Sequence, residues 1–181
     1  DYPDVSVNVA GIGLRNPTIL ASGVLGLSHS LMRRVADAGA GAATIKSVTR
    51  EPREGHNNPT VITYEAGMLN AVGYSNPGVD NAIEEFAEVD QLTIPAFASV
   101  VAEDAEEFAE VAEKLMQCPF AALEIPLSCP HTPGYGLLAG HGSPEATEEI
   151  ARAVRQATDR PVFVKLSPNV PALGEVALAA L

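Results

Sequence analysis

The sequence has few cysteines, few lysines and no long apolar run. Its two cysteines, Cys118 and Cys129, are too few among 181 residues for a disulfide framework, so we expect both to be reduced. No apolar run approaches the ~20 residues of a membrane-spanning helix, and residues 1–4 lack the basic start of a signal peptide. These absences predict a soluble, cytoplasmic protein without a membrane anchor.

Basic residues are also scarce: there are 11 lysines and arginines against 23 aspartates and glutamates, for a formal net charge of -12. A nucleic acid requires a basic surface, so this balance argues against a nucleic-acid partner. Scarce lysine together with abundant alanine favours a halophilic protein, because salt screens the self-repulsion of its acidic residues. A moderately acidic protein from a low-salt cytoplasm fits the composition nearly as well.

The chain is a succession of short apolar runs, each followed by a segment with helical periodicity. Residues 5–14 predict a β-hairpin, and five βα units follow. Nearly continuous apolar strands indicate a parallel sheet covered on both faces. We therefore expect an α/β fold, the N-terminal part of a (β/α)₈ TIM barrel, as a single domain over 1–181 with the C-terminal strands missing; an open five-stranded sheet is the alternative. The expected strands are 18–21, 42–45, 94–100, 121–125 and 162–166, and the expected helices begin at 28, 79, 104, 143 and 172.

The pattern makes three further local predictions. The helix capped by Ser28 has apolar residues Leu31, Val35 and Ala38 at helical spacing and is expected to end at Gly39. The segment from 46 to about 77 contains no convincing helix, and its apolar residues among glycines favour an ordered excursion. The helix over 104–116 has an apolar stripe and an acidic face that is expected to be solvated, made of Glu106, Glu107, Glu110 and Glu113.

The apolar run 123–127 leads into a Pro- and Gly-rich loop that contains Ser128, Cys129 and His131. In parallel α/β proteins the loops after the strands meet on one face, where catalytic residues are found. A thiol, with an ordinary pKa near ~8.5, can be adjusted by its neighbours to accept a proton near neutrality. Cys129 is therefore the candidate reactive residue, whereas Cys118 is expected to be structural. No further ligands at suitable spacing support a metal site with Cys129 and His131.

Five segments, each after an expected strand, make the chain resemble a known family. They are Arg15–Pro17 with Ala21–Gly23, Ile45–Thr49 with Glu51–Arg53, Met68–Gly73 with Asn76–Gly78, Ser128–His131, and Val164–Asn169. With these segments in this order, the chain resembles the class 1 dihydroorotate dehydrogenases, FMN-dependent barrel enzymes of pyrimidine synthesis, and most closely the archaeal 1B subtype.

The resemblance implies an oxidoreductase that converts (S)-dihydroorotate to orotate in de novo pyrimidine (UMP) biosynthesis. It implies that Cys129 removes the C5 proton while a hydride passes from C6 to FMN, and that a cation beside the flavin stabilises the reduced ring. The implied cofactor-binding residues are Ala21, Ser22, Gly23, Lys46, Ser47, Ser99 and Lys165. The implied substrate-binding residues are Lys46, Asn70, Ala71, Val72, Gly73, Tyr74 and His131.

The resemblance also implies an FAD and iron–sulfur electron-transfer subunit as a possible partner and a homo-oligomeric full-length form. Many family members have Asn where this chain has Pro126, and bacterial relatives often have Asn where it has His131. The family's phosphate-binding loops follow its last three strands, so a 181-residue polypeptide is expected to hold FMN weakly. Two alternatives stay open: a related flavin-dependent pyrimidine reductase and a non-catalytic barrel fragment.

Overall fold

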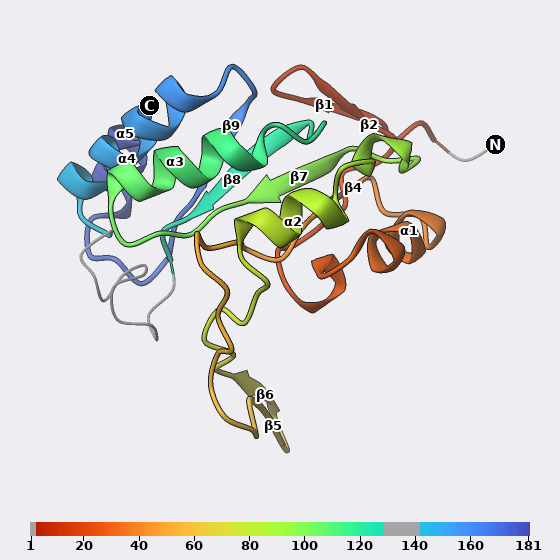
Figure 1. Ribbon diagram of the computed structural model, residues 1–181, viewed down its shortest axis with the longest axis horizontal. Coiled ribbons are helices and arrows are strands. Elements are labelled where there is room, and N and C mark those ends of the chain that lie inside the picture. The colour runs from red at the N-terminus through yellow and green to blue at the C-terminus, as the bar shows by residue number, and fades with distance from the viewer. Residues whose placement is uncertain (1–2, 129–141) are drawn as a thin grey trace.

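The computed structural model describes residues 3–128 and 142–181 (Figure 1). Its centre is a five-stranded parallel sheet in the order β3-β4-β7-β8-β9, which is also the order along the chain. Neighbouring strands in chain order with a helix after each one form the arrangement of a TIM barrel rather than of a doubly wound sheet. The expected barrel architecture is confirmed. The strands are β3 (Ile19–Leu20), β4 (Ala42–Thr44), β7 (Ala96–Ser99), β8 (Ala122–Pro126) and β9 (Val162–Lys165).

Helices cover the outer face of this sheet, and α2, α3 and α4 lie side by side across it in Figure 1. The side chains of Ser28, Asp104 and Ser143 cap α1, α3 and α4 by accepting backbone N–H bonds in the first turn. The predicted starts of these helices are confirmed. The helices are α1 (His29–Asp37), α2 (Val79–Glu85), α3 (Ala105–Leu115), α4 (Pro144–Ala157) and α5 (Leu173–Ala179), with short 3₁₀ turns at Val24–Gly26 and Val89–Gln91.

The strands contribute alternate side chains to two separate cores. Outward residues such as Ile45, Leu123 and Ile125 pack against the helices, together with Met32, Phe108 and Leu115 among others. On the inner face, Leu14, Ala42, Phe97 and Ala122 form a second cluster beside Phe163. Side chains alternate with period two along a strand, so the polar residues further along the same inner face line the interior of the barrel.

Two hairpins flank the sheet. The expected N-terminal hairpin is present as β1 (Val7–Val9) and β2 (Ile12–Leu14), and its residues pack against the inner cluster. The second hairpin, β5 (Val61–Tyr64) and β6 (Gly67–Asn70), lies within the expected excursion and was not predicted as strands. It projects away from the sheet in Figure 1, and all eight of its strand residues are exposed.

In α1 the fully buried residues are Met32 and Ala36, whereas Leu31 and Val35 are partly buried. One expectation about a helix face is wrong. In α3 the predicted apolar stripe is buried, but Glu107 is buried as well. Among the described residues, no helix is both long and apolar enough to cross a membrane.

Candidate functional site

The polar inner-face residues lie at the carboxyl ends of the parallel strands. Thr44 and Ser99 follow Ala42 and Phe97 by two residues on β4 and β7, and Glu124 follows Ala122 on β8. Thr44 and Ser99 are almost completely buried. The alternation therefore places an apolar layer at one end of the barrel interior and a polar layer above it.

Three serine hydroxyls form a continuous hydrogen-bonded row across three strand ends. Ser22 follows β3, Ser47 follows β4 and Ser99 ends β7. The Ser22 and Ser47 Oγ atoms are 2.9 Å apart, and those of Ser47 and Ser99 are 3.0 Å apart. A row of hydroxyls, each able to donate or accept, offers a buried polar edge to a heterocyclic ligand. The structure thus brings together three of the residues predicted to bind the cofactor.

Lys46 directly precedes Ser47 of this row in the chain, two residues after the end of β4. Its Nζ atom is 5.9 Å from the centre of the Tyr74 ring, within the range of a cation–π contact. Its backbone N–H donates to the Gly26 carbonyl at 2.9 Å. A side chain at Gly26 would place its Cβ 2.6 Å from the Lys46 nitrogen, so glycine permits this close approach. Two predicted substrate-binding residues, Lys46 and Tyr74, are therefore neighbours.

Lys165, the second predicted flavin-contacting lysine, ends β9. Its Nζ atom donates to Glu124 Oε1 at 2.8 Å across the β8–β9 pair. Glu124 was not predicted as a site residue. A signal for it was present, because Glu124 is the only charged residue in the apolar run 121–127, and a charge inside a buried strand requires a partner.

The other predicted substrate residues belong to the excursion between β4 and α2. Asn70 ends β6, pairs with Val61 and is exposed. Within the described residues, no hydrogen bond joins the Asn70 side chain to either lysine. Ala71 and Val72 instead contact His56: the Ala71 carbonyl is 3.1 Å from Nδ1, and the Val72 carbonyl accepts from the His56 N–H at 3.0 Å.

The base of the excursion is closed by Asn76, which is 6% exposed. Its Oδ1 accepts from the N–H groups of Thr49 and Gly78, at 3.2 and 3.0 Å. Its Nδ2 donates to Thr49 Oγ1 at 2.9 Å and to the Tyr74 carbonyl at 2.6 Å. One side chain thus fixes both ends of the excursion and the carbonyl of Tyr74, whose ring lies beside Lys46.

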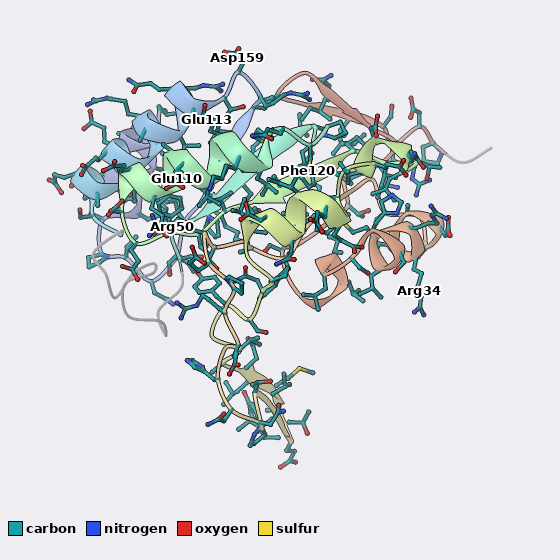
Figure 2. All side chains as sticks on the ribbon, viewed as in Figure 1. Arg34, Arg50, Glu110, Glu113, Phe120 and Asp159 are labelled. Carbon is teal, nitrogen blue, oxygen red and sulfur yellow. The ribbon has the colours of Figure 1, made fainter. Side chains whose placement is uncertain are left out.

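Arg50 attaches the same segment to α3. It pairs with Glu107 at 3.4 Å and with Glu110 at 3.3 Å, and Figure 2 shows Arg50 below the labelled Glu110. Glu107 also accepts from the backbone N–H of Glu103 at 2.8 Å. These contacts explain why Glu107 is buried. Glu110 also pairs with Lys114. Its hydrogen bonds to Lys114 and Arg50 lower the pKa of Glu110, and the nearby charge of Glu107 raises the pKa of Arg50.

Cys129 and His131 lie outside the described residues; Ser128, which precedes Cys129, is the last described residue of that segment. Ala21 and Gly23 flank Ser22 directly after β3. Among the described residues, no group of His, Cys, Asp and Glu could hold a metal ion.

Pro126 belongs to β8 and pairs with Lys165 in the sheet. Parallel pairing continues one residue further, since the Leu127 N–H donates to the Lys165 carbonyl at 2.9 Å. By the alternation of β8, Pro126 shares the inner face with Glu124. Proline has no side-chain amide, so this position of the inner face offers a ligand no donor.

Five parallel strands in chain order, with helices outside and hydroxyl and ammonium groups at their carboxyl ends, define the chain as part of a TIM barrel, a fold whose ligand sites lie at that end. The dihydroorotate dehydrogenase family model matches residues 4–181, and the chain belongs to this family. It is 41% identical over 98% of its length to "Dihydroorotate dehydrogenase B (NAD(+)), catalytic subunit" of Methanocaldococcus jannaschii. It is 43% identical over 97% of its length to the protein of that name from Pyrococcus abyssi.

The chain spans 58% of the length of each of these two relatives. It is also similar in fold to the crystal structure of DHODH from Eimeria tenella in complex with ferulenol, with a TM-score of 0.80 and 19% sequence identity. This likeness covers 99% of the present chain and 57% of that one. At this level of identity the comparison supports the barrel fold alone.

Proposed function

We propose that the natural-length protein oxidises (S)-dihydroorotate to orotate with FMN, as a cytoplasmic step of de novo pyrimidine biosynthesis. Family membership supports the reaction class. The observation with most weight is the row Ser22, Ser47 and Ser99, which lies on the strand ends next to Lys46. Flavins present carbonyl and ring-nitrogen groups that such hydroxyls and ammonium groups can hydrogen-bond, so the residues present fit this cofactor.

Each residue has a role in this proposal. Cys129 removes a proton from C5 of the substrate as a hydride leaves C6, so that the C5–C6 bond becomes a double bond. A bound flavin supplies the hydride acceptor. Lys46 and Lys165 provide positive charge beside the acceptor, where negative charge increases during the reaction. Asn70, Ala71, Val72, Gly73, Tyr74 and His131 line the substrate side, and Ala21 and Gly23 offer backbone groups beside Ser22.

The names of the relatives suggest the route by which electrons leave. They describe a catalytic subunit of an NAD(+)-dependent enzyme. For the present protein we propose an FAD and iron–sulfur partner subunit that passes electrons to NAD(+), with the catalytic chain as a homo-oligomer. Oxidation of dihydroorotate with an artificial electron acceptor would then proceed without the partner subunit, whereas reduction of NAD(+) would require it.

The test is an anaerobic absorption spectrum of the natural-length protein before and after dihydroorotate is added. We expect the oxidised-flavin bands to bleach, and Cys129→Ala to lose this bleaching while retaining bound flavin. The matched control is Cys118→Ala, because Cys118 is buried against the helices and should leave the bleaching intact. Retained flavin that dihydroorotate does not reduce would contradict the proposal.

A second candidate is a flavin-dependent pyrimidine reductase that acts on free uracil or thymine. Pro126 favours it, because the inner face has no amide there for the substrate. In the same experiment, bleaching by dihydrouracil but not by dihydroorotate would establish this alternative. Absence of flavin from the natural-length protein would instead support a non-catalytic barrel.

A further inference from the structure

Glu124 and Lys165 make a diagonal contact across two neighbouring strands. In the sheet register Glu124 lies opposite Phe163, and Lys165 lies opposite Pro126. Lys165 therefore directs its side chain back by two residues, toward the apolar end of the barrel, to reach Glu124 Oε1 at 2.8 Å. The Lys165 side chain has four rotatable bonds, and this contact restricts it to one direction.

The carboxylate lies in a position where it needs this partner. The side chain of Glu124 is 15% exposed, against 39% for Lys165. Its register neighbour on β7 is Ser99, the last hydroxyl of the serine row. A mostly buried carboxylate is costly unless it is paired, and a charge-assisted hydrogen bond compensates part of that cost. The pair thus lies directly beside the row of hydroxyls.

We propose that Glu124 is a positioning residue for the reaction, which acts through Lys165. It holds the ammonium group on the inner face next to the serine row and offsets its charge while no ligand is bound. The proposal rests on the proposed function, because Lys165 is there assigned to the flavin. Without the carboxylate, the Lys165 side chain would sample several orientations, and a flavin would have to order it on binding.

The first test is a double-mutant cycle on flavin affinity in the natural-length protein, made of Glu124→Gln, Lys165→Met and the two together. We expect Glu124→Gln to weaken flavin binding on the order of tenfold. If Glu124 acts through Lys165, the same change has no further effect once Lys165 is methionine. Equal effects of Glu124→Gln in both backgrounds would overturn the proposal. The matched control is Glu113→Gln, the same charge change on the exposed face of α3.

The second test needs no flavin and therefore separates this proposal from the proposed function. Within the present 181 residues there are three lysines, Lys46, Lys114 and Lys165, and their reductive ¹³C-methylation signals in the natural-length protein can be assigned by single Lys→Arg variants. In the apo-protein, Glu124→Gln should speed methylation of Lys165 severalfold and leave Lys114, which pairs with Glu110, unchanged. Glu124→Asp, which keeps the charge but is one methylene shorter, should give an intermediate rate.

The combined outcomes are distinct. Faster methylation of Lys165 in a protein that never binds flavin would support the positioning contact and refute the proposed function. Flavin reduced by dihydroorotate, with Lys165 methylated at the same rate in wild type and Glu124→Gln, would refute the positioning role alone. If Glu124→Gln does not fold, as judged by circular dichroism, the rate measured for Glu124→Asp decides the matter.

Discussion

Asn76 is expected to hold the base of the excursion closed, and Asn76→Ala is the perturbation that tests it. The change removes the acceptor of the Thr49 and Gly78 N–H groups and the donor to the Tyr74 carbonyl. The side chain is 6% exposed, so water does not readily replace it. Each orphaned buried group costs about 1–3 kcal/mol, so the two buried N–H groups alone give a loss of about 2–6 kcal/mol for the closed excursion.

Hydrogen exchange is the direct assay, because the excursion can open without unfolding of the barrel. The informative amides are those of His56 and Ala71, which donate to the carbonyls of Val72 and Thr60. A loss of about 2 kcal/mol or more should speed their exchange about 30-fold or more. Urea unfolding of the same variant reports how much of the loss reaches the whole domain.

The matched control is Asn81→Ala. Asn81 is exposed in the first turn of α2, and its side chain makes one hydrogen bond, to the Pro77 carbonyl at 2.8 Å. We expect a change within about 0.5 kcal/mol for this variant, as for most surface substitutions. If Asn76→Ala altered exchange at His56 and Ala71 no more than Asn81→Ala does, the closing role of Asn76 would be refuted.

Further predictions concern Gly73, Cys118 and the acidic surface. Gly73 has φ +74°, and an added Cβ would lie 2.7 Å from the His56 ring. At Gly11, φ is +85° but no atom lies within 4 Å of an added Cβ. Gly73→Ala should therefore lower the urea midpoint more than Gly11→Ala does, and equal losses would contradict this. Burial raises the pKa of the Cys118 thiol, so its alkylation should be slow at neutral pH and quicken only in alkali; fast labelling that persists in Cys129→Ala would be the contrary result. The same raised pKa means that folding favours the protonated thiol, so this contribution to stability is complete below the pKa of the unfolded chain and disappears as pH rises through the folded pKa. If the acidic surface reflects salt adaptation, the melting temperature should rise between about 0.1 M and about 1 M KCl, where the Debye length falls from ~10 to ~3 Å; a flat profile would favour the low-salt interpretation.

The repeating architecture could be predicted because its signals are local. Ser28, Asp104 and Ser143 begin helices by side-chain bonds to residues three positions later, so the cap and the group it caps lie within one turn. Short apolar runs likewise define the strands from their own composition. The strand ends then fix the row of Ser22, Ser47 and Ser99, since parallel strands bring their carboxyl ends to one face.

The β5–β6 hairpin could not be predicted in the same way. Its turn, Glu65–Ala66, lacks the Asn-Gly or Asp-Gly pair that marks tight hairpins, and all the strand residues are exposed, so no alternation of polar and apolar residues is imposed. Glu124 was missed for another reason. Its partner Lys165 is 41 residues away in the chain, and their contact depends on the register of two strands.

Salt should act on the contact between the buried Glu107 and Arg50. Its burial depends on Arg50, from a segment 57 residues earlier, and the Arg50 pairs with Glu107 and Glu110 connect the excursion to α3. Salt weakens these partly exposed pairs, while it also reduces repulsion among the remaining carboxylates of the acidic chain. Global stability and the attachment of the excursion should therefore respond to salt in opposite directions. Exchange at His56 would speed up with KCl while the melting temperature rises, and Arg50→Gln would remove the salt dependence of exchange alone. Exchange at His56 that KCl does not speed, or whose salt dependence persists in Arg50→Gln, would show that Arg50 does not hold the excursion.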